Sequence, residues 1–168
     1  LSSPTISGAW DGWISAGETW TYASATTINV PSGAASKYQK GDKIKITNNS
    51  ATKYFYVVGV ADTVLTVTGG SDYTVHNSAI TNPFFSKIEN PQGFPQYFNC
   101  TLTPTATSGS YTTASSTGRF AIYGRLLVLN GKYTITSKGT ASGVSVTTLP
   151  VNAIGTIAQG GIGREEAI

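Results

Sequence analysis

The sequence predicts an all-β protein with two modules, a small β-barrel followed by an antiparallel β-sandwich of jelly-roll type. Charged residues make up only 11% of the 168 residues, against roughly 25% in an average globular protein. Thr, Ser, Asn and Gly supply the polarity instead, and they favour turns and solvated strand faces. Short runs of alternating apolar and β-branched residues recur along the chain between turn segments, so we expect little helix anywhere.

The predicted barrel module covers residues 13–89. A lead-in segment, residues 1–12, precedes it, because Pro4, Gly8 and Gly12 interrupt any regular pattern there. Five or six short strands, none of them obviously central, are typical of a small barrel. We expect these strands at residues 19–24, 26–30, 43–47, 53–60, 63–68 and 84–89.

The stretch NPQGFPQYFN marks the boundary between the modules, and we assign residues 90–98 to a linker. Two prolines and a glycine within a few residues stop both helix and strand. The aromatic residues of this stretch are expected to pack against something, which makes them candidates for assembly contacts. They are Phe94, Tyr97 and Phe98.

The sandwich module is predicted over residues 99–168. Alternation places Tyr133 and Ile135 on one face of a strand and Lys132 on the other. This pattern is typical of an antiparallel sheet with one solvated side. The longest β-type runs of the module are residues 118–124, 125–137 and 143–151.

Charge and cysteine content exclude several classes of partner. Eleven basic residues against eight acidic ones give a formal charge of +3, a small surplus that argues against nucleic acid, whose binders show a denser basic face. Cys100 is the single cysteine, so no intrachain disulfide forms. This fits folding in a reducing cytosol, although many bacterial surface proteins also lack cysteine pairs. No apolar run approaches the roughly 20 residues of a membrane span, and no signal peptide is apparent.

The lysine-rich stretch KGDKIKI is interpreted as a turn followed by a strand with one solvated face. Ile44 and Ile46 point to one side of that strand, while Lys43 and Lys45 point to the other. A groove for an anionic polymer would add interleaved aromatic residues or arginines, and this strand has neither. We therefore expect the lysines to face water, where they protect a strand from wrong pairing.

No catalytic residue, metal site or cofactor is predicted. His76 is the only histidine, so a triad or a histidine-containing metal site would have to use it, and Cys100 lies beyond the module boundary. The carboxylates that glycoside hydrolysis would need as a pair sit mostly in turns, where Asp is favoured for local hydrogen bonds. The glycine-rich stretch GGIGRE lacks the preceding strand and the Lys-Ser/Thr end of a phosphate-binding loop.

Aromatic residues supply the candidates for ligand binding. Three tryptophans lie within eleven residues near the start of the chain, and tryptophan faces stack on sugar rings. The favoured alternative is that they fill the barrel or its junction with a neighbouring subunit. As a ligand we expect a neutral or mildly anionic surface glycan, for which tyrosines of the second module add further stacking faces. The candidate glycan-binding residues are Trp10, Trp13, Trp20, Tyr111, Tyr123 and Tyr133.

The chain resembles a module found in tail, tail-fibre and minor structural proteins of tailed bacteriophages and prophages. The first half carries the resemblance in DGWISAGETWTYASATTINVPSGAASKYQKGDKIKI, KYFYVVGVADTVLTVTGGSDYTV and ENPQGFP. The second half, GRFAIYGRLLVLNGKYTITSKGTASGVSVTTLPV, is similar to the β-sandwich module that commonly follows it. Similar proteins continue with further strands beyond a GREEA-like segment, so the sandwich module is expected to be incomplete at its C-terminus.

The resemblance implies a virion protein without catalytic residues, commonly trimeric and placed at the exposed ends of fibres or spikes. The leading expectation is a tail-fibre or spike protein that forms a homotrimer, contacts other virion proteins and attaches to a host-surface glycan. One alternative is a capsid decoration or connector protein. Another is a carbohydrate-active enzyme that degrades a capsule.

Overall fold

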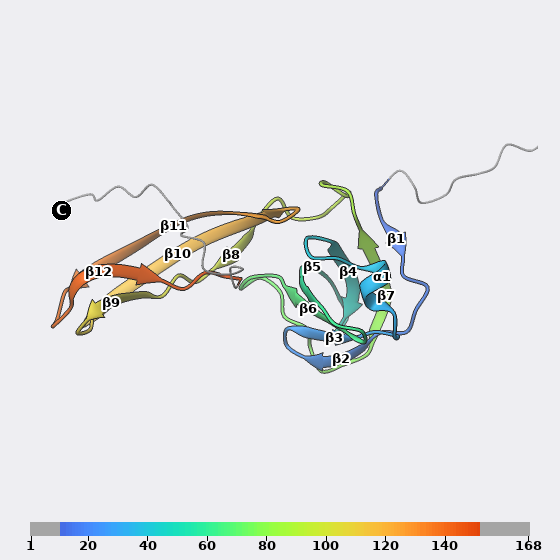
Figure 1. Cartoon of the computed structure of the whole chain (residues 1–168), viewed down its shortest axis with the longest axis horizontal. Helices are drawn as coiled ribbons and strands as arrows, with labels where there is room; N and C mark the ends of the chain where they lie inside the picture. Colours follow the sequence, from blue (N-terminus) through green and yellow to red (C-terminus); the bar gives the residue numbers. More distant parts are fainter. Residues whose placement is uncertain (1–10, 152–168) are drawn as a thin grey trace, which may run out of the picture.

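The computed structural model describes residues 11–151, which form a rounded module joined to an elongated one (Figure 1). Strands hold 54% of the described residues and helix 3%. Every strand pair is antiparallel. The predicted all-β class is therefore confirmed. Trp10 and the predicted part of the sandwich module after residue 151 lie outside the described residues.

The rounded module is built on one seven-stranded sheet with the order β1-β7-β4-β5-β6-β3-β2. A short helix, α1 (Ala34–Lys37), lies between β3 and β4 in the sequence. The β-branched and aromatic residues of this half fit a pleated, half-buried surface. The strands are β1 (Ile14–Ser15), β2 (Thr21–Ser24), β3 (Thr27–Asn29), β4 (Lys43–Asn48), β5 (Ala51–Val60), β6 (Val64–Thr68) and β7 (Ile80–Ser86).

This sheet is open, so the closed barrel that the sequence suggested is not observed. Strand β1 pairs only with β7, and β2 pairs only with β3. The two edge strands have two and four residues, with an irregularity between Tyr22 and Ser24. Such short edge strands offer few backbone groups for pairing with another strand. A barrel closes only when every strand pairs on both sides, and β1 and β2 do not pair with each other.

One face of the sheet encloses the hydrophobic core of the rounded module. Apolar residues alternate along the central strands, so Ile44 and Ile46 on β4 point to the same side as Phe55 and Val57 on β5. All four side chains are fully buried. The opposite face of the same two strands carries lysines and tyrosines, and it faces the linker and the elongated module.

The elongated module is a sandwich-like arrangement of two small antiparallel sheets. Three strands pair in the order β11-β10-β8, and β12 pairs with β9. A jelly roll has eight strands, whereas the described part of this module has five. They are β8 (Phe98–Cys100), β9 (Pro104–Ser108), β10 (Thr113–Tyr123), β11 (Leu126–Ser137) and β12 (Ser142–Thr147).

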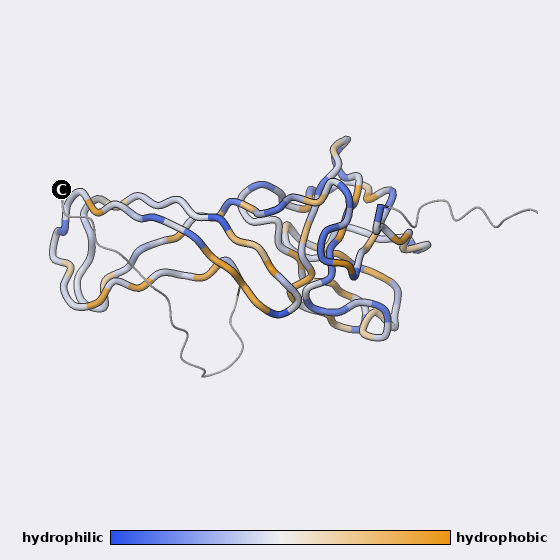
Figure 2. The backbone as a smooth tube through the Cα atoms, turned by 90° about the horizontal axis from the view of Figure 1, so that it is seen from above, coloured by the Kyte–Doolittle hydropathy of each residue, from blue (hydrophilic) through white to orange (hydrophobic). Residues whose placement is uncertain are grey.

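Buried apolar residues of the elongated module gather at the end that meets the rounded module. Leu102, Phe120 and Ile122 are buried there and belong to one cluster with Tyr56 of β5. Elsewhere in the module Val144 and Val146 are exposed. Figure 2 marks the hydrophobic residues along the chain in orange. Tyr133, predicted on the apolar face of its strand, is exposed, because no described element covers that part of β11. The core of this module is thus shared with its neighbour.

Candidate functional site

The two modules meet in an aromatic cluster. Phe98, at the start of β8, lies with its ring centroid 5.4 Å from Tyr56 of β5 and 6.0 Å from Phe120 of β10. Phe94 of the linker adds a ring 5.0 Å from Tyr56 and 5.6 Å from Phe98. These edge-on and tilted arrangements are favoured by aromatic rings. The linker therefore packs the elongated module onto the outer face of the first sheet.

The predicted assembly contacts separate into two kinds. Phe98 is 0% exposed and Phe94 is partly buried, both in the cluster within one chain, so the prediction that Phe98 contacts a neighbouring subunit is wrong. Burial inside the chain leaves no surface for a second copy. Tyr97 is different, because it is 45% exposed, with the Arg119 guanidinium 4.9 Å from its ring centroid.

Backbone contacts join the modules at the edges of this cluster. The carboxylate of Asp72 accepts hydrogen bonds from the backbone N–H and the side-chain amide of Asn99, at 2.7 and 2.9 Å. On the other side, Gly41 approaches Gly124 of the β10–β11 turn so closely that a Cβ atom on Gly41 would lie 2.2 Å from the Gly124 carbonyl oxygen. With a φ of 95°, Gly41 also adopts a conformation that favours glycine.

The lysine face of β4 is covered, so the prediction that it faces water is wrong for Lys43. Lys43 is only 4% exposed, with its ammonium 5.7 Å from the Tyr56 ring centroid and 6.0 Å from that of Phe94. Lys45 is partly buried, and its ammonium lies 4.6 Å from the Trp13 ring. These lysines make cation–π contacts because Trp13 and the linker residue Phe94 pack over the strand.

The tryptophans that the structure describes offer no free face to a sugar. Trp13 is buried and donates its indole N–H to the carbonyl of Gln92 at 2.8 Å. Trp20 is buried in the core and donates to Glu18 at 3.0 Å. Stacking of Trp13 and Trp20 on a glycan is therefore ruled out, and the favoured alternative of packing in the interior agrees with the structure for both.

Glu18 is the centre of a small polar network beside the core. Its carboxylate accepts hydrogen bonds from Trp20, from the Tyr38 hydroxyl at 2.7 Å and from the Lys37 ammonium. Burial by itself raises the pKa of Glu18, but the hydrogen bonds together outweigh it and hold the pKa below its ordinary value. The network fixes the segment between β1 and β2 against helix α1 and the core.

The three candidate tyrosines do not form one site. Tyr123 ends β10 beside the rounded module, whereas Tyr133 on β11 pairs with Ser116. Seven residues of β10 separate these two positions, a distance of roughly 24 Å along a strand. Tyr111 lies in the loop between β9 and β10 and is partly buried. Tyr123 and Tyr133 are 44% and 42% exposed, so each presents a ring surface of its own.

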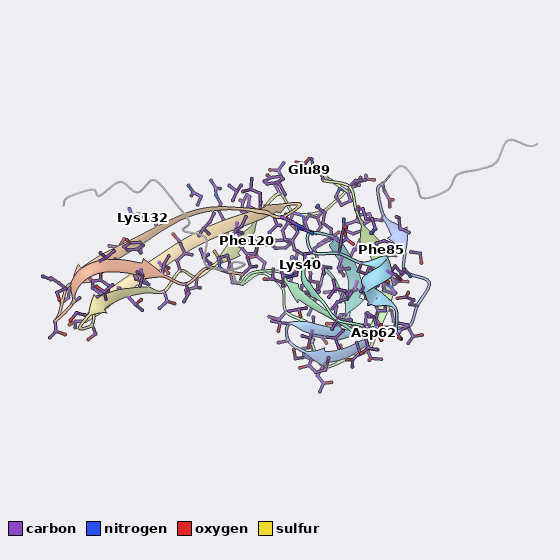
Figure 3. All side chains as sticks on the ribbon, viewed as in Figure 1. Lys40, Asp62, Phe85, Glu89, Phe120 and Lys132 are labelled. Carbon is purple, nitrogen blue, oxygen red and sulfur yellow. The ribbon has the colours of Figure 1, made fainter. Side chains whose placement is uncertain are left out.

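A polar pocket of about 310 Å³ opens at the module junction, and we call it the junction pocket. Figure 3 shows Lys40 and Glu89, two of its residues, at the side of the rounded module that meets the elongated one. Three segments distant in the sequence form it: the turn before β4, the segment after β7 and the β10–β11 turn. Its lining residues are Gln39, Lys40, Gly41, Asp42, Lys43, Lys87, Glu89, Tyr123 and Gly124.

Two of the residues that line the junction pocket, Asp42 and Lys43, are buried charges. The Asp42 carboxylate accepts a hydrogen bond from the Gln39 backbone N–H at 3.0 Å and lies 3.7 Å from the Lys87 ammonium. Burial raises the pKa of Asp42. Burial also lowers the pKa of Lys43, although Asp42 and Glu89 act against that shift. Within the described chain, no hydrogen bond or ion pair reaches the Lys43 ammonium.

Sequence reasoning missed this pocket, although it named Lys43 and Tyr123 separately. The antiparallel pairing of Lys43 with Ser86 brings Lys87 and Glu89 next to the start of β4. Docking of the elongated module then adds Tyr123. No local sequence pattern predicts the pairing of β4 with β7 or the docking of the elongated module, so the pocket could not be predicted from the sequence.

The residues considered for catalysis are not arranged as a reactive centre. Cys100 is buried in the junction cluster, and burial, with Asp72 nearby, raises the pKa of its thiol, whereas a cysteine nucleophile needs a lowered pKa. His76 lies exposed in a loop on the rounded module. Among residues 11–151, no group of three or more His, Cys, Asp or Glu side chains is placed to hold a metal ion. The stretch GGIGRE lies outside the described residues.

No helix in the described part of the chain is long and apolar enough to cross a membrane. Comparison with family models, curated proteins and solved structures finds no match to this chain.

Proposed function

We propose that this chain is a non-enzymatic structural protein of a bacteriophage virion, of the tail-fibre or spike type, which assembles as a homotrimer. Its partners are further copies of itself, other virion proteins and a host-surface glycan, and its place is the virion, assembled in the bacterial cytoplasm. The resemblance of residues 11–46 and 118–151 to phage structural modules supports this proposal. The observation that carries it is the apolar surface of the elongated module.

Apolar side chains stand out of the elongated module in alternating positions. Val144 on β12 is 67% exposed, and Val146 on the same face of that strand is exposed as well. Leu126 and Val128 repeat the pattern on β11. Burying one such side chain stabilises by about 1.5–3 kcal/mol. An exposed row of them is typical of a surface that another molecule covers.

The strand edges of the elongated module favour the same conclusion. The sheet formed by β9 and β12 has only two strands, so each keeps one unpaired edge among the described residues. A two-stranded ribbon is marginally stable in water, and a third strand or a packed face is needed to hold it. Neighbouring copies in a fibre supply both a covering face and edge protection.

Attachment to a host glycan is proposed for the exposed tyrosines rather than for the tryptophans. Tyr123 and Tyr133 keep accessible rings on a surface rich in Thr, Ser and Asn. Such rings stack on the apolar face of a sugar, and the surrounding hydroxyl and amide groups pair with its hydroxyls. These are the features that a non-enzymatic attachment surface needs.

Light scattering of the full chain at micromolar concentration tests the assembly. We expect about three times the chain mass of 17.5 kDa. A double variant, Val144→Thr with Val146→Thr, should shift the protein toward the monomer. The matched control is Ile14→Thr, which removes an equally exposed apolar side chain from the rounded module and should leave the mass unchanged. A monomeric parent protein would contradict the proposal.

Antibody labelling of phage particles in the electron microscope tests the location. We expect label at the tail or at a spike, whereas label over the capsid would favour a decoration or connector protein. Incubation of the particles' protein with host polysaccharide should release no reducing ends. Release of reducing ends would contradict the non-enzymatic proposal and favour capsule hydrolysis.

A further inference from the structure

The junction pocket contains a buried positive charge without a direct partner. Lys43 lines the pocket and is 4% exposed, and within residues 11–151 its ammonium has neither a hydrogen bond nor an ion pair. Aromatic rings lie at 5.7 and 6.0 Å from it. A buried charge is costly unless it is paired and hydrogen-bonded. A bound anion in the pocket would supply the missing partner.

The charges around the pocket set the charge of a suitable ligand. Lys40, Lys43 and Lys87 contribute three positive charges, and Asp42 and Glu89 contribute two negative ones. One positive charge is left over, which matches a ligand with one negative charge. A densely charged polymer such as nucleic acid would meet the two carboxylates, and like charges brought together disfavour binding.

The remaining lining fits a sugar. Tyr123 stands at the rim with an accessible ring, a platform for the apolar face of a pyranose. The Glu89 carboxylate can accept hydrogen bonds from hydroxyl groups, and the Gln39 side chain can both donate and accept. The volume of about 310 Å³ stands at the lower end of the roughly 300–1,000 Å³ of small-molecule sites, which is suitable for one or two sugar units.

We infer that the junction pocket binds a glycan unit that carries a single negative charge, with Lys43 as the partner of the anion and Tyr123 as the stacking platform. This inference rests on the proposed function in host attachment and names the ligand class of that function. The negative charge has two sources in surface polymers, the carboxylate of a uronic acid and the phosphodiester of a sugar–phosphate or polyol-phosphate chain. Both present oxygen atoms to an ammonium group.

Titration of the ¹⁵N-labelled full chain, followed by NMR, tests the inference with three probes. Methyl glucuronide carries the carboxylate, glycerophosphoglycerol carries the phosphodiester, and methyl glucoside is the neutral ring. We expect one of the charged probes to shift the amide signals of residues 39–43 and 123–124 in a saturable way. The neutral probe should bind about tenfold more weakly, since it lacks the charge-assisted hydrogen bond. The charged probe that binds more tightly identifies the source.

Two variants should weaken the binding of the charged probe, each by about tenfold. Lys43→Met removes the charge and keeps the length of the side chain, a replacement that buried charges tolerate well. Tyr123→Ala removes the platform. Lys87→Gln, at a half-exposed position of the pocket, is the further variant if Lys43→Met fails to fold. Tyr97→Ala is the matched control, because its side chain is 45% exposed, about as much as that of Tyr123, but does not line the pocket.

The inference is overturned if neither charged probe shifts the pocket signals, if methyl glucoside binds as tightly as they do, or if Tyr97→Ala weakens binding as much as Tyr123→Ala. The proposed function still stands after any of these outcomes if the chain is trimeric and antibodies against it label the phage tail. If instead a charged probe binds saturably at the pocket, but the chain is monomeric and antibodies against it do not label phage particles, the proposed function fails and the inference about the pocket stands. The two proposals therefore fail separately.

Discussion

Phe98 holds the two modules together, and replacing it with alanine tests that role. Its side chain is fully buried and lies among rings of both modules, 5.4 Å from Tyr56 and 6.0 Å from Phe120 between centroids. The other buried apolar residues of the elongated module lie mostly in the same cluster. We therefore expect Phe98→Ala to release the elongated module before the rounded module unfolds.

The expected loss follows from the cavity that the variant leaves. A buried Phe→Ala change costs about 3–5 kcal/mol, because the transfer free energy of the ring is lost and the surroundings relax only in part. Tyr97→Ala, one residue earlier, is the matched control. Tyr97 is exposed and contacts Arg119 across its ring, an arrangement worth about 0.5–1 kcal/mol at the surface.

Urea unfolding with two probes measures this difference, at one protein concentration because assembly shifts apparent stability. The described tryptophans, Trp13 and Trp20, lie in the rounded module, so their fluorescence reports that module, while NMR signals of residues 118–123 report the elongated one. The unfolding curves from the two probes should coincide in the parent protein, whereas in Phe98→Ala the elongated module should unfold at a lower urea concentration than the rounded one. The reasoning is refuted if the two unfolding curves of Phe98→Ala still coincide and its free energy of unfolding falls by less than about 1 kcal/mol, as at ordinary exposed positions.

Three further predictions concern the rounded module. The pKa of Glu18 is lowered from 4.5 in the folded state, so its contribution to the free energy of unfolding is complete above pH 4.5 and is lost as the pH falls through the lowered pKa. Glu18→Gln should abolish that part of the acid destabilisation. An unchanged pH profile of the urea midpoint would contradict this. Asn48 is buried and accepts the His76 backbone N–H at 2.7 Å, so Asn48→Ala should lower the free energy of unfolding by about 2 kcal/mol, and a calorimetric loss of near zero would oppose it. Gly41→Ala, which places a Cβ against the Gly124 carbonyl oxygen, should destabilise by about 1–3 kcal/mol; an unaltered melting temperature would show that the two turns do not touch.

The sequence determined the local structure well where alternation is regular. It predicts strands at 43–47 and 53–60, and the structure has β4 and β5 at Lys43–Asn48 and Ala51–Val60. It also predicts that Ile44 and Ile46 share a face, and both are buried in the core. Side-chain direction in a strand repeats every two residues, so this information is local and readable. Barrel closure was not readable, because it depends on whether distant edge strands meet.

The candidate site depended on contacts between distant segments. Sequence reasoning selected Tyr123 and Tyr133 together, and only the tertiary structure separated them, because strand register sets their positions along the ribbon. It named Trp13 and Trp20 as candidate glycan-binding residues while favouring packing in the interior, and the structure places both in the interior. Composition cannot distinguish a tryptophan that packs inside from one that meets a ligand, since both uses require the same ring.

By itself, the sequence predicted antiparallel β structure and, where alternation is regular as in β4, which residues share a face. Only the tertiary structure decided what covers those faces. Lys43 has the sequence context of a solvated lysine, yet the linker and the elongated module bury it and bring Lys87, Glu89 and Tyr123 around it. The physical reason is that alternation fixes the direction of a side chain, whereas burial and pKa depend on the segments that pack against it from elsewhere in the chain.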